Sequence, residues 1–519
     1  MKKLYLFILM VVPLFFVSCF EDEGNYSYKD VDEIEIEGME SAYTKNSYNG
    51  EVLEIDPVIK TAYTDLEYEW WMWEPNKEDI YTGWDPDAKP YEAELISTDK
   101  KLAYEVNCPI GQYKLMLKVK SKSNGYFSTQ VVDFNSETLF TRGFYILKET
   151  ADGKTEVDLY NRNNELMPDL LQTVGHGAME GKPRAMSCVQ SHGMVTEAGE
   201  YKEIHTVCVT TEANKIAFYD TEAFNRVHDE KDVIDGGLKE GDVPYLAFSY
   251  GMSNYFLSSR GCFVTYVFST MSTSGTFSIP ATTGGASQFV IPGGLAMGMS
   301  AYFWDADNQR IDYTDFYSFG QMFGPYDDSE FPTQGMKCIA CGSSQAMGKG
   351  YFILEDAAGK RYIYLTSLNS CRTEARHEID PESKLAKATH FAANALTANN
   401  LYYIYNNKLY IFSLGDLSEK EVPLTLEGMG ASETITYLSY QWQNYEGDVE
   451  NNFTHLVVGT QQGDTYRLYM YDIEAGEPKE LVRKIEGTGK LKQCVYMSPM
   501  QYGTNYETGI TNQDISLPL

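Results

Sequence analysis

Basic side chains are scarce in this sequence of 519 residues. It carries 42 Lys and Arg against 74 Asp and Glu, which gives a formal net charge of −32. A field of this sign repels phosphate backbones, so the composition argues against nucleic-acid binding. The apolar run from Leu4 to Val17 is too short to cross a bilayer as a permanent helix.

Catalytic and metal-binding signatures are also missing. There is no HExxH, GxSxG or P-loop motif, so zinc-protease, α/β-hydrolase and nucleotide-binding functions lack their sequence marks. Cys338 and Cys341 have CxxC spacing, but no second pair follows at zinc-finger distance. Residues three apart on a strand face opposite sides, so we expect no metal and no cofactor at this pair.

What the chain has in excess is aromatic side chains, 14% of residues with 40 Tyr and 25 Phe, and these favour strands. Two apolar runs, residues 143–148 and 154–160, flank an Ala151-Asp152-Gly153 turn and predict a β-hairpin. A near copy occupies residues 350–365. A hairpin repeated so far along the chain indicates an array of similar units.

Seven such hairpins follow one another at intervals of roughly 46 to 62 residues, near the period of a four-stranded propeller blade. The predicted hairpins cover residues 143–160, 205–219, 255–267, 301–313, 350–365, 401–412 and 455–471. Inner strands are predicted at residues 184–189, 245–248, 336–340 and 433–437. Residues 493–497 would complete the first blade and close the ring, which removes open sheet edges.

The expected fold is therefore all-β, with a seven-bladed propeller over residues 140–519. Six or eight blades are neighbouring alternatives, and two stacked sandwiches are a different one. Residues 31–136 form a separate domain in this prediction, with strands at 33–36, 52–55, 66–73, 102–106, 113–119 and 126–134. About six short strands in this length come close to an Ig-like sandwich.

The N-terminus carries an export signal. Lys2 and Lys3 precede the apolar run, and Ser18 lies before Cys19, as in a secretory signal. Phe16-Val17-Ser18-Cys19 resembles a bacterial lipoprotein box, which implies a signal peptide over residues 1–19 and a lipid on Cys19. Residues 20–30 would be an acidic linker.

Three further features resemble one family. Glu21, Asp22 and Glu23 resemble the surface-export signal of Bacteroidetes lipoproteins. Residues 111–119, GQYKLMLKV, resemble a strand of PKD-type domains, and residues 68–71 resemble their Trp-bearing strand. Together with residues 143–161 these features are similar to the PKD-like lipoproteins of Bacteroidetes. That resemblance implies a lipid anchor in the outer membrane, facing the cell exterior. It also implies as partners a Sus-like TonB-dependent channel and its binding lipoprotein.

Candidate ligand contacts are aromatic. Strand alternation puts Trp70 in the sandwich core and Trp71 and Trp73 on the other face, where they would stack on a ligand or pack on the next domain. Tyr437, Tyr440 and Trp442 form a second aromatic group near an inner strand, suited to sugar or peptide stacking or to core packing.

Candidate chemical groups lie in two segments. The long connection from Asn161 to Tyr201 carries His176, Glu180 and His192, which could assemble an acid/base or metal site. The stretch Asp305-Ala306-Asp307-Asn308 could bind calcium, but a hairpin turn is favoured there because Asp and Asn bond locally.

The sequence thus favours a non-catalytic surface lipoprotein that binds or hands over peptide or glycan at a nutrient importer. A secreted propeller enzyme, a polysaccharide lyase or glycoside hydrolase, is the first alternative. A purely structural docking partner of the importer is the second.

Overall fold

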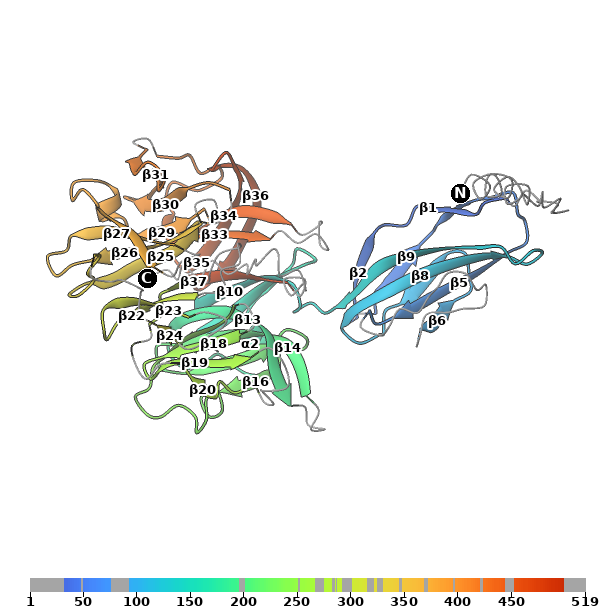
Figure 1. Ribbon diagram of the computed structural model, residues 1–519, viewed down its shortest axis with the longest axis horizontal. Coiled ribbons are helices and arrows are strands. Elements are labelled where there is room, and N and C mark those ends of the chain that lie inside the picture. The colour runs from blue at the N-terminus through green and yellow to red at the C-terminus, as the bar shows by residue number, and fades with distance from the viewer. Residues whose placement is uncertain are drawn as a thin grey trace, which may run out of the picture. The chain divides into compact units, whose positions relative to one another are not determined.

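The computed structural model describes residues 32–47, 50–75, 93–195, 201–250, 253–266, 275–281, 285, 287–291, 301–314, 322–323, 330–344, 348–367, 372–394, 397–420, 423–443 and 452–498. The chain divides into two compact units (Figure 1). The first comprises the chain up to Tyr43, Val52–Glu105 and Gln112–Phe134, and the second comprises the rest.

Short antiparallel strands build the first unit. They are β1 (Glu35–Glu37), β2 (Ala42–Asn46), β3 (Val52–Ile55), β4 (Val58–Lys60), β5 (Leu66–Trp73), β6 (Glu94–Ser97), β7 (Leu102–Glu105), β8 (Gly111–Ser121) and β9 (Phe127–Glu137). One sheet has the order β2-β9-β8-β5-β6, while β1 pairs with β4 and β3 with β7. This is the sandwich that the sequence predicts.

Trp70 is the core tryptophan of this unit, as predicted. It is fully buried, and its indole Nε1 donates a 3.0 Å hydrogen bond to the carbonyl oxygen of Asp99. The prediction missed β2, β4 and β6. Their side chains are mostly half-buried or exposed, so these strands lack the alternation of buried and exposed positions that marks a strand in sequence.

Four-stranded sheets build the second unit, and seven of them lie within the described residues. Numbered along the chain, sheet 1 holds β10 (Gly143–Glu149), β11 (Thr155–Asn161), β12 (Leu166–Met167) and β37 (Lys490–Met497). Sheet 2 holds β13 (Pro183–Val195), β14 (Tyr201–Thr211), β15 (Ile216–Asp220) and β16 (Arg226–Asp229). Sheet 3 holds β17 (Pro244–Tyr250), β18 (Ser253–Ser258), β19 (Gly261–Tyr266) and β20 (Ile279–Pro280). Sheet 4 holds β21 (Val290–Ile291), β22 (Ala301–Asp305), β23 (Arg310–Thr314) and β24 (Met322–Phe323).

The remaining sheets follow the same plan. Sheet 5 holds β25 (Lys337–Ser344), β26 (Lys349–Glu355), β27 (Arg361–Ser367) and β28 (Arg372–Glu378). Sheet 6 holds β29 (His390–Ala393), β30 (Asn400–Tyr405), β31 (Lys408–Ser413) and β32 (Ser418–Glu419). Sheet 7 holds β33 (Thr434–Gln443), β34 (Phe453–Gln462), β35 (Thr465–Glu474) and β36 (Glu477–Thr488). Among the described residues, two short helices, α2 (Leu170–Thr173) and η4 (Leu385–Lys387), lie in connections between strands.

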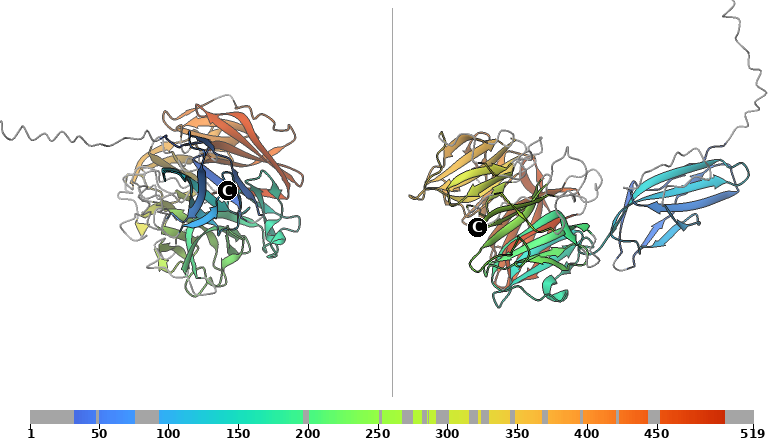
Figure 2. Two further views of the ribbon diagram at one scale, coloured as in Figure 1. Left: turned by 90° about the vertical axis from the view of Figure 1, so that its right-hand side faces the viewer. Right: turned by 60° about the horizontal axis from the view of Figure 1, so that its bottom comes forward.

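Apolar packing joins the sheets into a propeller. Each of seven buried clusters contains side chains from at least two consecutive sheets, and one of them joins sheet 7 to sheet 1. Figure 2 shows the red strands of sheet 7 beside the teal strands of sheet 1. Burying apolar area on both faces of each sheet is favourable by roughly 25 cal/mol per Å², so neighbouring sheets stabilise one another.

All seven predicted hairpins are present, in the predicted places. The ring closure is also confirmed: β37, the last strand, pairs with β10 of the first hairpin over Gly143–Glu149. No helix among the described residues is long and apolar enough to span a membrane.

Candidate functional site

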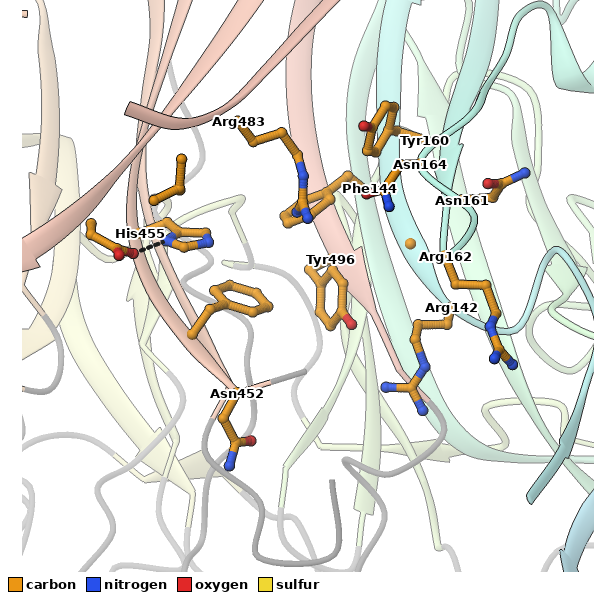
Figure 3. Close-up of a pocket in the computed structure, with 14 residues that line it drawn as sticks. Arg142, Phe144, Tyr160, Asn161, Arg162, Asn164, Asn452, His455, Arg483 and Tyr496 are labelled. Atoms are coloured by element: carbon orange, nitrogen blue, oxygen red, sulfur yellow. Dashed lines mark ion pairs between the residues drawn. The ribbon is translucent and has the colours of Figure 1, made fainter. Parts of the chain in front are cut away.

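A pocket of about 280 Å³ opens where sheet 7 meets sheet 1 (Figure 3). Its walls are the first residues of β10 and β34, the last residues of β11 and β37, and parts of β35 and β36. The lining residues are Arg142, Gly143, Phe144, Tyr160, Asn161, Arg162, Asn164, Asn452, Phe453, His455, Asp472, Val482, Arg483 and Tyr496.

Gly143 allows the sheet 1 wall to form. A Cβ atom at this position would lie 2.4 Å from the carbonyl oxygen of Tyr160, so a larger residue would push β10 away from β11. With glycine there, Phe144 pairs directly with Tyr160 across the ladder. The two rings therefore enter the same wall of the pocket.

Aromatic side chains from three strands meet at the pocket. The ring centroid of Phe144 lies 4.8 Å from that of Tyr496 and 5.7 Å from that of Phe453. Phe453 packs edge-on against Tyr496 and stacks on the imidazole of His455 at 4.7 Å. Phe453 is only half-buried, so part of its ring remains open to a ligand.

Two of the three arginines in the pocket are paired with one carboxylate. Arg142 Nη2 lies 2.7 Å from Glu137 Oε1, and both side chains are buried. Arg162 Nη1 lies 3.4 Å from Glu137 Oε2. Glu137 and Arg142 flank residues 138–141, and their buried ion pair spans this short segment within the second unit.

Arg483, on β36, is the third arginine. Its guanidinium carbon lies 5.2 Å from the ring centroid of Phe144 and 5.5 Å from that of Tyr160. Figure 3 shows the guanidinium reaching toward the Phe144 ring from the side of the pocket opposite Arg142 and Arg162. Cation–π contacts at both rings fix its orientation.

His455 brings an imidazole to the same place. Burial lowers the pKa of His455, and the carboxylate of Asp472, whose Oδ1 lies 3.0 Å from Nδ1, opposes that shift. With its pKa below the ordinary value, the imidazole is mainly neutral at pH 7. The positive charge of the pocket therefore comes from its arginines.

A second pocket of about 590 Å³ adjoins the first. The two share Asn452, Phe453 and Asp472. The second is otherwise lined by Gln443, Thr454, Ile473, Glu474, Lys479 and Glu480, so carboxylates outnumber cations there.

The structure does not bring the three predicted catalytic residues together. His176 lies near Tyr219, with Nε2 2.8 Å from the carbonyl oxygen of Phe224. His192 packs on Phe218, which points to the other face of β15 from Tyr219. Glu180 is exposed, with Oε1 3.0 Å from Lys154 Nζ.

The surroundings of His192 explain this separation. It is fully buried inside the propeller, not in an open loop, and Nε2 lies 2.8 Å from the carbonyl oxygen of Gly275. Burial lowers the pKa of His192 to about 3. The residue lies on β13, because the inner strand continues beyond its predicted end at residue 189.

Four of the five predicted aromatic contacts are core residues. Trp73 is 5% exposed in the first unit, and Tyr437, Tyr440 and Trp442 are buried between propeller sheets. Packing accounts for these four rings, and they are not accessible to a ligand. Trp71 is half-buried, and its Nε1 donates a 3.0 Å hydrogen bond to Glu69 Oε2.

The Asp305–Asn308 stretch forms the predicted turn between β22 and β23. The backbone N–H of Asn308 donates to Asp305 Oδ1 at 2.9 Å, and that of Gly285 donates to Asp307 Oδ2 at 2.9 Å. Across the described ranges, no cluster of three or more His, Cys, Asp or Glu side chains is arranged to hold a metal ion, calcium included. Cys19, Glu21, Asp22 and Glu23 lie outside the described residues.

None of the candidate site residues predicted from the sequence lines the first pocket. The lining residues of this pocket come from six strands and the residues next to them, are more than 300 positions apart at the extremes, and meet only because the ring closes. The sequence does contain one local indication of this pocket, which is an aromatic or basic residue at the end of a strand. Phe453 is the first residue of β34, and Arg142 directly precedes β10.

Comparison with protein families supports part of the resemblance noted in the sequence. Residues 19–183 match the PKD-like family. The PKD-like region thus extends through β10 and β11 and includes seven of the fourteen lining residues of the first pocket. No curated protein matches the sequence.

The chain is similar to solved structures at low sequence identity. A quinoprotein alcohol dehydrogenase-like protein from Bacteroides thetaiotaomicron is 14% identical, with 88% of this chain and 96% of that chain covered and a TM-score of 0.40. A periplasmic gluconolactonase from Pseudomonas aeruginosa is 11% identical, with 69% and 99% covered and a TM-score of 0.39. The Dos1 propeller is 9% identical, with 72% and 83% covered and a TM-score of 0.36.

Proposed function

We propose that this protein is an outer-membrane surface lipoprotein that binds a peptide or glycan nutrient without catalysis and hands it to a Sus-like TonB-dependent importer. The lipid on Cys19 would anchor the chain, and the acidic residues Glu21, Asp22 and Glu23 would direct it to the cell exterior. Its partners would be the channel and the binding lipoprotein of that importer.

The pocket between sheets 7 and 1 carries the binding part of the proposal. It combines a partly open Phe453 ring, a guanidinium held over two further rings and amide side chains at Asn164 and Asn452. Apolar walls with a few placed polar groups are typical of small-ligand sites. Phe453 is central, because both pockets share it.

The test is a binding screen with turnover monitored. Full-length protein, purified in detergent, is titrated with pools of short peptides and of oligosaccharides, and products are followed by mass spectrometry. We expect saturable binding without product, weakened at least about tenfold by Phe453→Ala, since burial of an aromatic ring contributes several kcal/mol. Turnover of any bound ligand would replace binding by catalysis as the function.

The matched control is Phe263→Ala on β19. Phe263 is also half-buried, and it packs beside Arg260, whose guanidinium carbon lies 5.8 Å from its ring centroid. It belongs to sheet 3 and lines neither pocket. Ligand affinity should not change in this variant. Equal losses in both variants would locate the ligand elsewhere.

A further inference from the structure

Arg483 carries a charge that the described part of the protein does not neutralise. Arg142 and Arg162 both pair with Glu137, whereas no carboxylate among the described residues forms an ion pair with Arg483. Its side chain is half-buried, and its guanidinium is oriented by Phe144 and Tyr160. A planar fork of N–H donors in this position matches a carboxylate, which it binds through two parallel hydrogen bonds.

The charges around Arg483 favour an anion. Three guanidinium groups stand against two carboxylates, Glu137 and Asp472, so one positive charge is in excess. This local excess is notable in a chain whose formal net charge is −32. The pocket is locally positive although the protein as a whole is acidic. An anionic group of a ligand would be attracted to the pocket.

The adjoining second pocket has the opposite sign. Asp472, Glu474 and Glu480 line it against the single cation Lys479. Asp472 and Phe453 belong to both pockets. A ligand that crosses Phe453 from the first pocket to the second therefore passes from a positive to a negative environment.

We propose that these two pockets bind a short peptide by its free C-terminal carboxylate at Arg483, with a basic residue further along the peptide in the second pocket. A peptide supplies both charges, and its backbone amides can bond to Asn164 and Asn452. An acidic polysaccharide would place carboxylates against Glu474 and Glu480. A neutral glycan would leave Arg483 without a partner. This ligand class rests on the proposed binding function of the same site.

The experiment compares two peptides that differ at one group. N-acetylated Ala-Lys-Ala-Phe is prepared with a free C-terminal carboxylate and as the C-terminal amide, and each is titrated into detergent-purified full-length protein by calorimetry. We expect the free acid to bind at least about tenfold more tightly than the amide, because a hydrogen-bonded charge pair is lost in the amide. Arg483→Gln should remove this preference, and Arg483→Lys should restore part of it.

A modified peptide and the variant Glu480→Gln test the second pocket, and a further variant serves as the control. Replacing the peptide lysine by norleucine should weaken binding several-fold, and Glu480→Gln should reduce that difference. Arg376→Gln on β28 is the matched control, because Arg376 lies 4.4 Å over the ring of Tyr362, outside both pockets. It should leave both peptide affinities unchanged.

The outcomes separate the ligand class from the binding function. The assignment of Arg483 as the carboxylate-binding residue is overturned if the free-acid peptide and the peptide amide bind equally well. It is also overturned if Arg483→Gln still prefers the free acid. Binding of an oligosaccharide but of neither peptide, with loss in Phe453→Ala, overturns the peptide class and leaves the binding function standing. Failure of all peptides and oligosaccharides overturns both.

Discussion

The hydroxyl of Tyr466 donates a 2.6 Å hydrogen bond to Asp158 Oδ2, across the seam where the last sheet meets the first. The two residues are 308 positions apart in the sequence. On the other side of the carboxylate, Lys148 Nζ lies 2.6 Å from Oδ1. Burial raises the pKa of Asp158, and Lys148 opposes the shift. The seam is thus closed by a buried, fully partnered carboxylate as well as by β37.

Replacing Tyr466 with Phe should destabilise the propeller by roughly 1.5–3 kcal/mol, the range for hydrogen bonds to charged groups. The reason is that Asp158 stays buried and loses one donor. Chemical denaturation followed by tryptophan fluorescence measures the loss.

Tyr471→Phe is the matched control on the same strand. The Tyr471 hydroxyl donates to the neutral backbone carbonyl of Glu427 at 2.8 Å, and such a bond contributes about 1 kcal/mol. If both variants lost the same free energy of unfolding, the hydrogen bond from Tyr466 to the Asp158 carboxylate would be no more stabilising than one to a neutral carbonyl.

Gly459 on β34 has no room for a side chain. A Cβ atom there would lie 2.2 Å from Leu491 Cδ2 and 2.7 Å from Tyr437 Cβ, both in the cluster that joins sheets 7 and 1. Gly459→Ala should therefore cost roughly 1–3 kcal/mol through overpacking. In Gly415→Ala the nearest atom would be Asn399 Nδ2 at 3.5 Å, and we expect a change within about 0.5 kcal/mol. Thermal unfolding of the two variants would contradict this account if their midpoints moved equally.

The Asp312 carboxyl should make the folded protein less stable as the pH rises. Burial raises its pKa to about 7, with the Arg310 guanidinium lowering it and Asp305 raising it further. In the unfolded chain the group titrates near 3.9. The Asp312 carboxyl therefore stays protonated to a higher pH in the folded state than in the unfolded chain. Its contribution to the free energy of unfolding declines from about pH 4 to about pH 7 and is constant above that.

The corresponding experiment measures the free energy of unfolding at pH 5 and pH 8 for the wild type and for Asp312→Asn. Asparagine cannot ionise, so only the wild type should lose stability at this position when the pH is raised. The free energy of unfolding of the variant relative to that of the wild type should therefore increase from pH 5 to pH 8 by on the order of 2 kcal/mol. Asp356→Asn serves as the control, because the pKa of the Asp356 carboxyl is lowered by a hydrogen bond from the backbone N–H of Lys360. Its effect should be the same at both pH values. A constant difference for Asp312→Asn would show that this carboxylate stays ionised when folded.

The propeller was predictable because its information is local. Hairpins such as β10–β11 combine apolar strands with a tight turn at Gly153, and both features lie within about 20 residues. The prediction that Cys338 and Cys341 face opposite sides was wrong. A β-bulge between Cys338 and Ala340 shifts the register and puts both thiols in one apolar cluster. The first pocket was not predictable in the same way, because its walls form only when the ring closes.

The proposed lipid on Cys19 can be tested by the cell fraction in which the protein is found. Cys19→Ala should move the protein from the detergent-extracted membranes to the soluble fraction, since without acyl chains nothing of comparable affinity holds it there. Cys108→Ala, which changes a free, half-buried cysteine, should remain in the membrane fraction. Immunoblots of the two fractions give the answer, and a membrane-bound Cys19→Ala protein would refute the lipid anchor.

Surface exposure is a separate prediction. Replacing Glu21, Asp22 and Glu23 together with Ala should keep the protein in the membrane fraction but protect it from protease added to intact cells. The control replaces Glu35 and Glu37, which belong to β1, by Gln. If the triple variant were digested as fast as the control, the acidic cluster would have no role in export.

Salt should change peptide affinity according to the peptide's overall charge. The net charge of −32 attracts a cationic peptide and repels an anionic one at long range. The proposed contact of the C-terminal carboxylate with Arg483 would be the same for both peptides. Raising the salt from about 20 to 300 mM shortens the Debye length to below about 10 Å and screens mainly the long-range part. Affinity for a net-positive free-acid peptide should therefore fall with salt, and affinity for a net-negative one should fall less or rise. Calorimetric titrations at the two salt concentrations test this, and a parallel loss for both peptides would mean that the Arg483 contact alone sets the salt dependence.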